Sequence, residues 1–106
     1  MTRYTVKISN RFWQTAKALR SKYTHEQFAE IISIIRDCIN ELAEKGFIEE
    51  NGWDDHMLIR PSFSDGCHYE FHIFDNDILV VYFRRERNRF IRMVGVYDHA
   101  TIPGNR

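Results

Sequence analysis

The sequence predicts an α+β fold, in which a small antiparallel sheet with an N-terminal strand carries a helical hairpin on one face. Three observations predict it. Side chains alternate between polar and apolar near the N-terminus, apolar residues then recur at helical spacing up to residue 45, and the period returns to two after residue 67. The expected order is one strand, two helices and three strands (βααβββ), in a single domain spanning residues 1–106.

The N-terminal half contains the first strand and both helices. Residues 3–8 alternate as a half-buried strand does. Asn10 is a good N-cap, and apolar residues follow at steps of four, three and four along residues 12–23, which predicts a short helix with a basic outer face. A capping box at Thr24 begins the second helix, and Gly46 supplies its C-cap.

The C-terminal half is predicted to supply the rest of the sheet. Residues 47–66 contain glycines, a proline and an acidic patch, and we expect an irregular connection there. Three strands follow, at residues 67–73, 78–83 and 90–97. The last two should meet at a turn near Arg87 and Asn88, and Gly95 should mark a bulge or a close approach. We expect the sheet face opposite the helices to stay open and to carry function.

Composition excludes several classes of protein. The longest apolar run, Ile78–Phe83, is far shorter than the roughly 20 residues of a membrane helix, and no apolar signal core follows Met1. Cys38 and Cys67 are expected to be small buried hydrophobes, which fits a reducing cytoplasm. We therefore expect a cytoplasmic protein with no membrane partner.

The net charge is zero, but the charges are segregated along the chain. Residues 1–25 carry six basic and no acidic side chains, residues 26–77 carry three basic and thirteen acidic ones, and residues 78–106 carry six basic and two acidic ones. If the two ends meet in the fold, one basic face could attract phosphate although the whole is neutral.

Histidine is the side chain best suited to proton transfer near neutral pH. Four histidines lie in the second half of the chain: His56, His68, His72 and His99. His25, in the first turn of the second helix, is expected to be a surface residue. No phosphate-binding glycine loop, serine elbow or Cys-x-x-Cys motif is present.

A run of arginines lies where the last hairpin turns. Five arginines fall within nine residues: Arg84, Arg85, Arg87, Arg89 and Arg92. Their planar guanidinium groups can bind phosphate at two points, although the same run could simply keep the hairpin soluble. Together with the histidines, these arginines suggest metal-free RNA cleavage, in which the 2′-hydroxyl attacks its own phosphate.

A second interpretation is a metal site. His68, Glu70 and His72 share one face of a predicted strand, with roughly 6–7 Å between neighbours. Zinc or iron could bind such a set, with His99 as a further ligand, but a polar sheet face gives the same pattern. We expect no metal and no other cofactor.

The C-terminal half resembles the YafQ branch of the RelE toxins, in the RelE/ParE superfamily. The resemblance rests on Asp55-His56-Met57-Leu58, on His72-Ile73 followed shortly by Asp77-Ile78-Leu79-Val80-Val81-Tyr82, and on His99. The predicted N-terminal strand and helical hairpin fit the same plan. The resemblance implies the toxin of a type II toxin–antitoxin pair, a ribosome-dependent mRNA endoribonuclease held inactive by a cognate antitoxin.

The resemblance also implies roles for individual residues. His56, His72, Asp77 and His99 would form the catalytic group, with Glu70 at a position that is often acidic in the branch. The segment after His72 is one residue longer than usual, so Asp75 competes with Asp77 for the acidic role.

The implied partners are the antitoxin, the ribosome and mRNA, and the toxin–antitoxin complex would bind its operator DNA through the antitoxin. Two departures from the branch stand out. Ile102 and Pro103 follow His99 where an aromatic residue is usual, and the chain is neutral where these toxins are commonly basic. A ParE-like or inactive relative that binds a protein target is the alternative within this fold.

Overall fold

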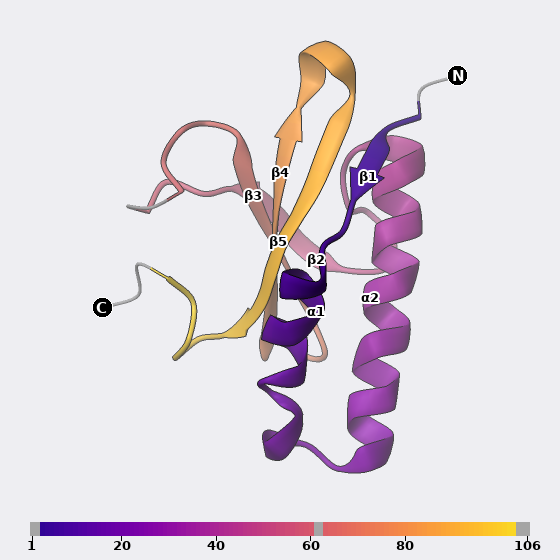
Figure 1. Cartoon of the computed structure of the whole chain (residues 1–106), viewed down its shortest axis with the longest axis vertical. Coiled ribbons are helices and arrows are strands. Elements are labelled where there is room, and N and C mark those ends of the chain that lie inside the picture. The colour runs from indigo at the N-terminus through magenta and orange to yellow at the C-terminus, as the bar shows by residue number, and fades with distance from the viewer. Residues whose placement is uncertain (1–2, 61–62, 104–106) are drawn as a thin grey trace.

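A computed structural model describes residues 3–60 and 63–103 of the chain (Figure 1). The elements are β1 (Thr5–Lys7), α1 (Asn10–Lys17), a 3-10 helix (Arg20–Lys22), α2 (His25–Lys45), β2 (Trp53–Met57), β3 (His68–Ile73), β4 (Ile78–Arg85), a second 3-10 helix (Glu86–Asn88) and β5 (Phe90–Asp98). No helix in these two described ranges is long and apolar enough to cross a membrane.

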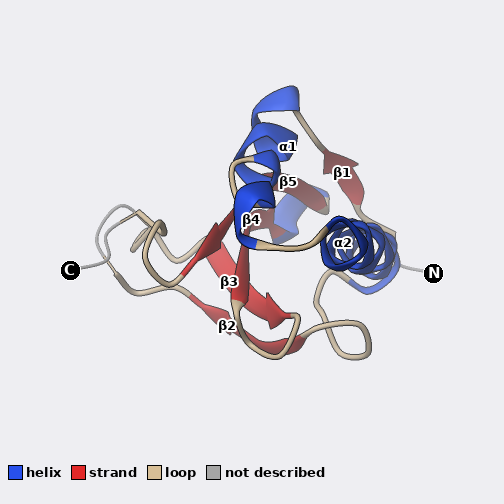
Figure 2. Ribbon diagram, turned by 90° about the horizontal axis from the view of Figure 1, so that it is seen from below, coloured by secondary structure: helices blue, strands red, loops and turns tan. Residues whose placement is uncertain are grey.

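The strands form one sheet in the order β1-β5-β4-β3-β2, with the two helices packed on one side (Figure 2). The pairs from β2 to β5 are antiparallel, which confirms the α+β class. The sheet is mostly antiparallel, as predicted, and β1 pairs with β5 in the parallel sense.

A fifth strand lies where we expected an irregular connection. Residues 53–57 form β2 on the outer edge of β3, while residues 61 and 62 of that connection lie outside the described residues. The register shifts between Trp53 and His56, so Asp54 and Asp55 together face one residue of β3. Such a bulge breaks the alternation of side chains, which explains why the period-two pattern did not reveal this strand.

The helix ends follow capping chemistry. Ser9, rather than Asn10, caps α1, and its hydroxyl accepts from the Phe12 amide. At the start of α2, Thr24 and Gln27 form the predicted capping box, and Gly46 ends that helix with a φ of 83°. Only residues that tolerate the left-handed region fit at such a position.

The main core lies between the helices and the sheet. Its buried members include Phe12, Ile31, Ile35, Leu42, Phe71, Val80 and Ile91. A smaller cluster on the other face joins Leu58, Phe63, Leu79, Val81 and Ile102. The expectation of a fully open second face was therefore wrong, because the segments after β2 and β5 fold over part of it. Cys38 is buried and Cys67 is half-buried, and both are free thiols.

The last hairpin behaves as predicted. Its turn is the 3-10 helix at residues 86–88. The β4–β5 register shifts beside Gly95, which opposes Val81 while Met93 opposes Tyr82. A Cβ atom at Gly95 would collide with the Tyr97 ring, so this position is both a bulge and a close approach.

A buried carboxylate fastens the connection between α2 and β2. Glu41 is 4% exposed, and its oxygens accept from the backbone amides of Glu49, Glu50 and Asn51 and from the Asn51 side chain. Burial alone would raise the pKa of Glu41, but these hydrogen bonds outweigh it and hold the pKa below its usual value. The loop has no helical or strand hydrogen bonds at these amides, and Glu41 supplies acceptors for them instead.

A second carboxylate, the half-buried Asp55, fixes β2 itself. Asp55 accepts from the Tyr82 hydroxyl at 2.9 Å and from the Ile48 amide at 2.7 Å. Burial raises the pKa of Asp55, although both hydrogen bonds and the nearby Arg84 oppose that shift. The strand is thus tied to the centre of the sheet as well as to its neighbour.

Replacing Glu41 by Gln should lower the free energy of unfolding by about 2 kcal/mol at neutral pH, because charged hydrogen bonds to several amides are lost. The folded-state pKa of Glu41 is depressed, so its contribution is present above the unfolded pKa of about 4.3 and disappears as the pH falls through the folded value. Urea unfolding of both proteins at several pH values measures this. Glu30→Gln, at an exposed position of the same helix, is the control; an equal loss in both variants would contradict the assignment.

Candidate functional site

The centre of the candidate site is a buried pair of polar residues on β3. Glu70 is 3% exposed and His72 is 7% exposed, on the sheet face that does not carry the helices. Phe71 and Ile73 point into the helix-side core, so the predicted alternation is confirmed. The polar side of this strand is nevertheless buried rather than hydrated.

One carboxylate oxygen serves two histidines. Glu70 Oε2 lies 3.2 Å from His72 Nε2 and 3.5 Å from His56 Nε2. This arrangement follows from the register, because His56 on β2 is directly opposite Glu70. The two imidazole rings are 6.1 Å apart. Glu70 therefore orients both rings, while its other oxygen is buried without a hydrogen-bond partner among the described residues.

The bulge in β2 supplies a second carboxylate. Asp54 has a φ of 57°, in the left-handed region that non-glycine residues seldom adopt. This turns its carboxylate to within 3.5 Å of His72 Nδ1, and its carbonyl accepts from His56 Nδ1 at 2.7 Å. The next residue, Asp55, points to the other face. Because of the bulge, Asp54 lies at the candidate site and Asp55 lies on the side of the core.

His99 completes a row of three imidazoles. It follows β5, and its ring is stacked on His72 with 6.1 Å between centroids and 23° between planes. Its Nε2 lies 2.9 Å from the Asn76 carbonyl, which can only accept, so this nitrogen carries the proton. His72 consequently lies between His56 and His99, and both outer rings are exposed.

The protonation of His72 is set by opposing effects. Burial lowers its pKa from the usual value, and the neighbouring His56 and His99 act in the same direction. The carboxylates of Glu70 and Asp54 oppose this by favouring the imidazolium. The net direction is downward, so His72 is largely neutral at pH 7 and can accept a proton there.

The structure separates other predicted site residues from this row. His68 shares the face of β3, but it pairs with Asp65 at 2.9 Å and contacts the rings of Phe63 and Phe83. Across residues 3–60 and 63–103, no group of three or more His, Cys, Asp or Glu side chains is arranged to hold a metal ion. Nothing in the geometry thus favours the metal interpretation.

The two competing aspartates of the β3–β4 turn lie on different sides of it. Asp75 lines a hollow of about 540 Å³ that also includes Trp53 and His72. Asp77 lines a smaller hollow, of about 320 Å³, together with His99. Neither carboxylate contacts His72, whereas Glu70 and Asp54 do.

The arginine run lies at the far end of the β4–β5 hairpin from the histidines (Figure 1). Arg84 is used structurally: its Nη1 donates to the Gly46 carbonyl at 2.6 Å, and its guanidinium lies over the Tyr69 ring. The remaining four arginines, Arg85, Arg87, Arg89 and Arg92, are exposed. They form a basic tip, and they do not line the histidine site.

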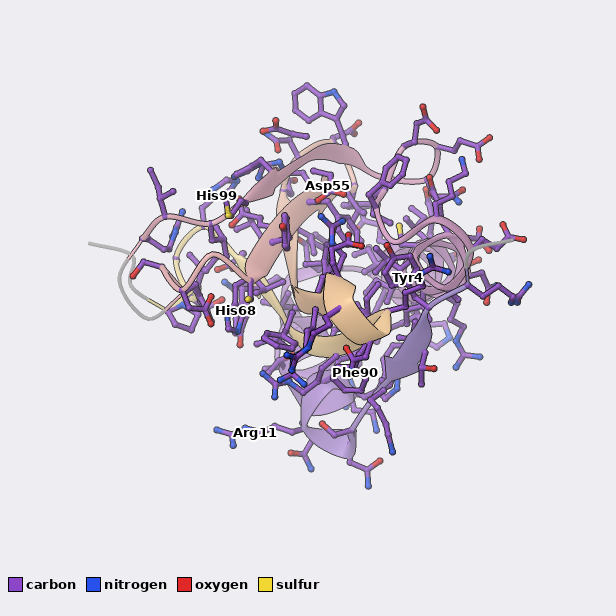
Figure 3. All side chains as sticks on the ribbon, turned by 90° about the horizontal axis from the view of Figure 1, so that it is seen from above. Tyr4, Arg11, Asp55, His68, Phe90 and His99 are labelled. Carbon is purple, nitrogen blue, oxygen red and sulfur yellow. The ribbon has the colours of Figure 1, made fainter. Side chains whose placement is uncertain are left out.

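Basic residues of the N-terminal segment point elsewhere. Figure 3 shows Arg11 projecting outward from α1, well away from His68 and His99. Lys22 reaches back to form an ion pair with Asp98, immediately before His99. The charge segregation of the sequence therefore places one cation beside the site through Lys22.

Two neighbours of His72 were missed by sequence reasoning. Trp53 and Asp54 are brought to it by β2, a strand that the sequence pattern did not indicate. The tryptophan itself was a signal of a functional position. It lies in a polar segment, where it belongs to no helical or strand pattern of apolar residues.

Comparison with known proteins gives distant structural matches. No family model matches the chain, and no curated protein is similar to it in sequence. The conserved hypothetical protein HP0892 of Helicobacter pylori is 21% identical, with 92% of this chain and 96% of that chain covered and a TM-score of 0.46. A chain of the archaeal RelE–RelB complex of Pyrococcus horikoshii is 15% identical, with 95% and 100% covered and a TM-score of 0.45. At this similarity, function has to be argued from the site.

Replacing Asp54 by Asn should lower the pKa of His72 further, because it removes a charge that favours the imidazolium. Asparagine tolerates the left-handed backbone, so the bulge should persist. Titration of the histidine ring protons by NMR measures the shift, with the His25 signal as an internal reference. An unchanged His72 titration would show that Asp54 has no electrostatic influence on the ring.

Proposed function

We propose that this protein is a ribosome-dependent mRNA endoribonuclease, the toxin of a type II toxin–antitoxin pair. The observation that carries the proposal is the row of three imidazoles, with His72 held between two carboxylates at its centre. The row unites His56, His72 and His99, which the sequence resemblance implies to be catalytic. Asp77, with Asp75 as its alternative, stays the candidate for the acidic catalytic role, and Glu70 is proposed as a carboxylate that orients the histidines.

The proposed reaction needs two proton transfers at one phosphorus atom. A base removes the proton of the 2′-hydroxyl as its oxygen attacks the adjacent phosphate, and an acid protonates the departing 5′-oxygen. Both oxygens are bonded to the same phosphorus in the transition state, so the acid and the base must be neighbours. Two pairs qualify, His56 with His72 and His72 with His99, each with centroids 6.1 Å apart. His72 belongs to both pairs.

In either pair, one histidine is buried and the other is exposed, and this gives them different properties. His72 is fixed by its carboxylates, which holds its ring in one orientation before substrate arrives. The outer histidines are exposed and can follow the substrate. We do not divide the acid and base roles between them.

Phosphate binding is proposed for the basic tip. Arg85, Arg87, Arg89 and Arg92 are exposed there, and Arg85 and Arg92 stack on the Phe83 ring. Because the tip is remote from the histidines, its role would be to hold ribosomal RNA or a distant part of mRNA, rather than the scissile phosphate. We do not propose this role for Arg84, because its guanidinium donates to the Gly46 carbonyl.

An antitoxin partner is supported by apolar side chains on the surface. The exposed large hydrophobic residues are Ile8, Phe47, Trp53, Met57 and Ile59. Ile59 is 85% exposed, and Met57 lies on the edge strand that also holds His56. A protein that covers such residues would gain apolar burial and would block the histidines at the same time.

Expression without the antitoxin should arrest growth, with mRNA cut inside translated regions. Replacing His72 or His99 by Gln should relieve the arrest and reduce single-turnover cleavage on ribosomes by at least ~10²-fold, because a proton transfer is lost. His25→Gln, at an exposed position outside the site, should cleave at the parental rate. Normal growth and intact transcripts at full expression of the parental protein would overturn the proposed function. Parental cleavage by both site variants would overturn the mechanism.

The double variant Arg85→Ala, Arg87→Ala should bind ribosomes more weakly, and the logarithm of its affinity should depend less steeply on salt concentration. Each phosphate contact that is removed takes about one unit from that slope. Ribosome sedimentation at several salt concentrations measures both quantities. Lys7→Ala with Lys17→Ala, which removes two exposed charges elsewhere, is the control. If the salt dependence of the affinity is unchanged, the tip arginines do not bind phosphate and only keep the hairpin soluble.

A further inference from the structure

The hollow beside His72 has a wall that the proposed chemistry does not use. It has a volume of about 540 Å³ and lies between the start of β2 and the β3–β4 turn. Its lining residues are Asn51, Gly52, Trp53, His72, Ile73, Phe74, Asp75 and Asn76. A volume of this size is typical of sites for small ligands or parts of larger ones.

Trp53 is the most unusual residue of that wall. It is 63% exposed, although burying a tryptophan contributes more free energy than burying almost any other side chain. Its backbone pairs with His72 across the β2–β3 ladder, so both side chains project from the same face, and their rings are 6.2 Å apart. The indole of Trp53 is therefore accessible to solvent and lies next to the ring of His72.

We propose that this hollow binds one base of single-stranded RNA, stacked on Trp53, with its polar edge toward Asp75 and Asn76. The proposal rests on the proposed function and assigns the base-recognition site next to its histidines. Single-stranded RNA is read by stacking unpaired bases on aromatic rings and by hydrogen bonds to their edges.

The charges of the hollow favour a base over a phosphate. Among its lining residues there is no Lys or Arg, and Asp75 adds a negative charge that would repel phosphate. A base is neutral, and it offers a flat face together with polar edge atoms. One nucleotide would thus bind at both places, with its base in the hollow and its phosphate at the imidazoles.

Asp75 also suggests which bases fit. A carboxylate accepts hydrogen bonds only, so it pairs with the exocyclic amines of adenine, cytosine and guanine. Uracil has no exocyclic amine, and its edge donor N3–H is flanked by two carbonyl oxygens that would face the carboxylate unfavourably. We therefore expect an amine-bearing base to be preferred to uracil.

The turn that carries Asp75 has a restricted backbone. Phe74, Asp75 and Asn76 have φ values of 54°, 54° and 70°, three successive residues in the left-handed region. The Asn76 carbonyl of this turn also accepts from His99. The turn is thus held to the histidine row from one side, and this fixes the distance between the base edge and the reacting phosphate.

Fluorescence of a single-tryptophan protein tests base binding without ribosomes or catalysis. In the Trp13→Phe background, Trp53 is the only tryptophan. AMP and CMP should quench its emission saturably with a Kd on the order of 1 mM, UMP should bind at least about threefold more weakly, and ribose 5-phosphate should not quench. In NMR spectra, AMP should shift the Gly52 and Asn76 amides.

Two variants test the same site during cleavage. Trp53→Ala should lower single-turnover cleavage on ribosomes at least about fivefold by losing a stacking contact, whereas Trp53→Phe should retain most of the rate. Asp75→Asn should narrow the difference between amine-bearing bases and uracil, both in mononucleotide binding and in the choice of cut sites.

The outcomes separate the two proposals. If AMP quenches the fluorescence saturably but the parental protein does not cleave mRNA, the base-binding site is supported and the proposed function is overturned. Cleavage by Trp53→Ala at the parental rate and with the parental choice of cut sites would overturn the base site alone. Absence of mononucleotide quenching, or equal quenching by ribose 5-phosphate, would also overturn it.

Discussion

The arrangement of the site depends on the hydrogen bonds by which Glu41 fixes the loop that follows α2. Three successive backbone amides converge on this buried carboxylate, and β2 begins two residues after the last of them. Since β2 is an edge strand, it has a neighbour on one side only, and beyond its short, bulged ladder with β3 it is held by this loop and by the hydrogen bonds of Asp55. Trp53, Asp54 and His56 are all placed by this strand, so a carboxylate on the helical side of the molecule determines the geometry of the histidine side.

Carboxylates recur because the molecule organises its polar groups around buried negative charge. Glu41 holds a loop, Asp55 holds Tyr82, and Glu70 holds two imidazoles. Donors offset the cost of burying the carboxylates of Glu41 and Asp55, whereas Glu70 keeps one oxygen without a hydrogen-bond partner among the described residues. At the histidine row this has a chemical consequence: the carboxylates of Glu70 and Asp54 that fix the His72 ring also favour its protonated form and partly offset the effect of burial on its pKa.

The sequence predicted the features that depend on local periodicity and capping, and it failed where distant pairing decides. The capping box at Thr24, the alternation along β3 and the bulge at Gly95 follow from a few neighbouring residues. The parallel pairing of β1, the existence of β2 and the burial of Glu70 depend on segments far apart in the chain. His56, His72 and His99 were proposed from a resemblance, but their contact with Glu70 requires the β2–β3 register, and Asp54 reaches His72 only through a left-handed bulge. No local pattern encodes either one.

The parallel contact between β1 and β5 has a consequence for the order of folding. The amide of Val96 donates to the hydroxyl of Thr15, 81 positions earlier, and β1 pairs only with the last strand. During synthesis the N-terminal strand and α1 therefore stay without their partner in the sheet until β5 has been made. His99 follows that same last strand. Before β5 and His99 are made, the nascent chain thus has neither a complete sheet nor a complete row of imidazoles.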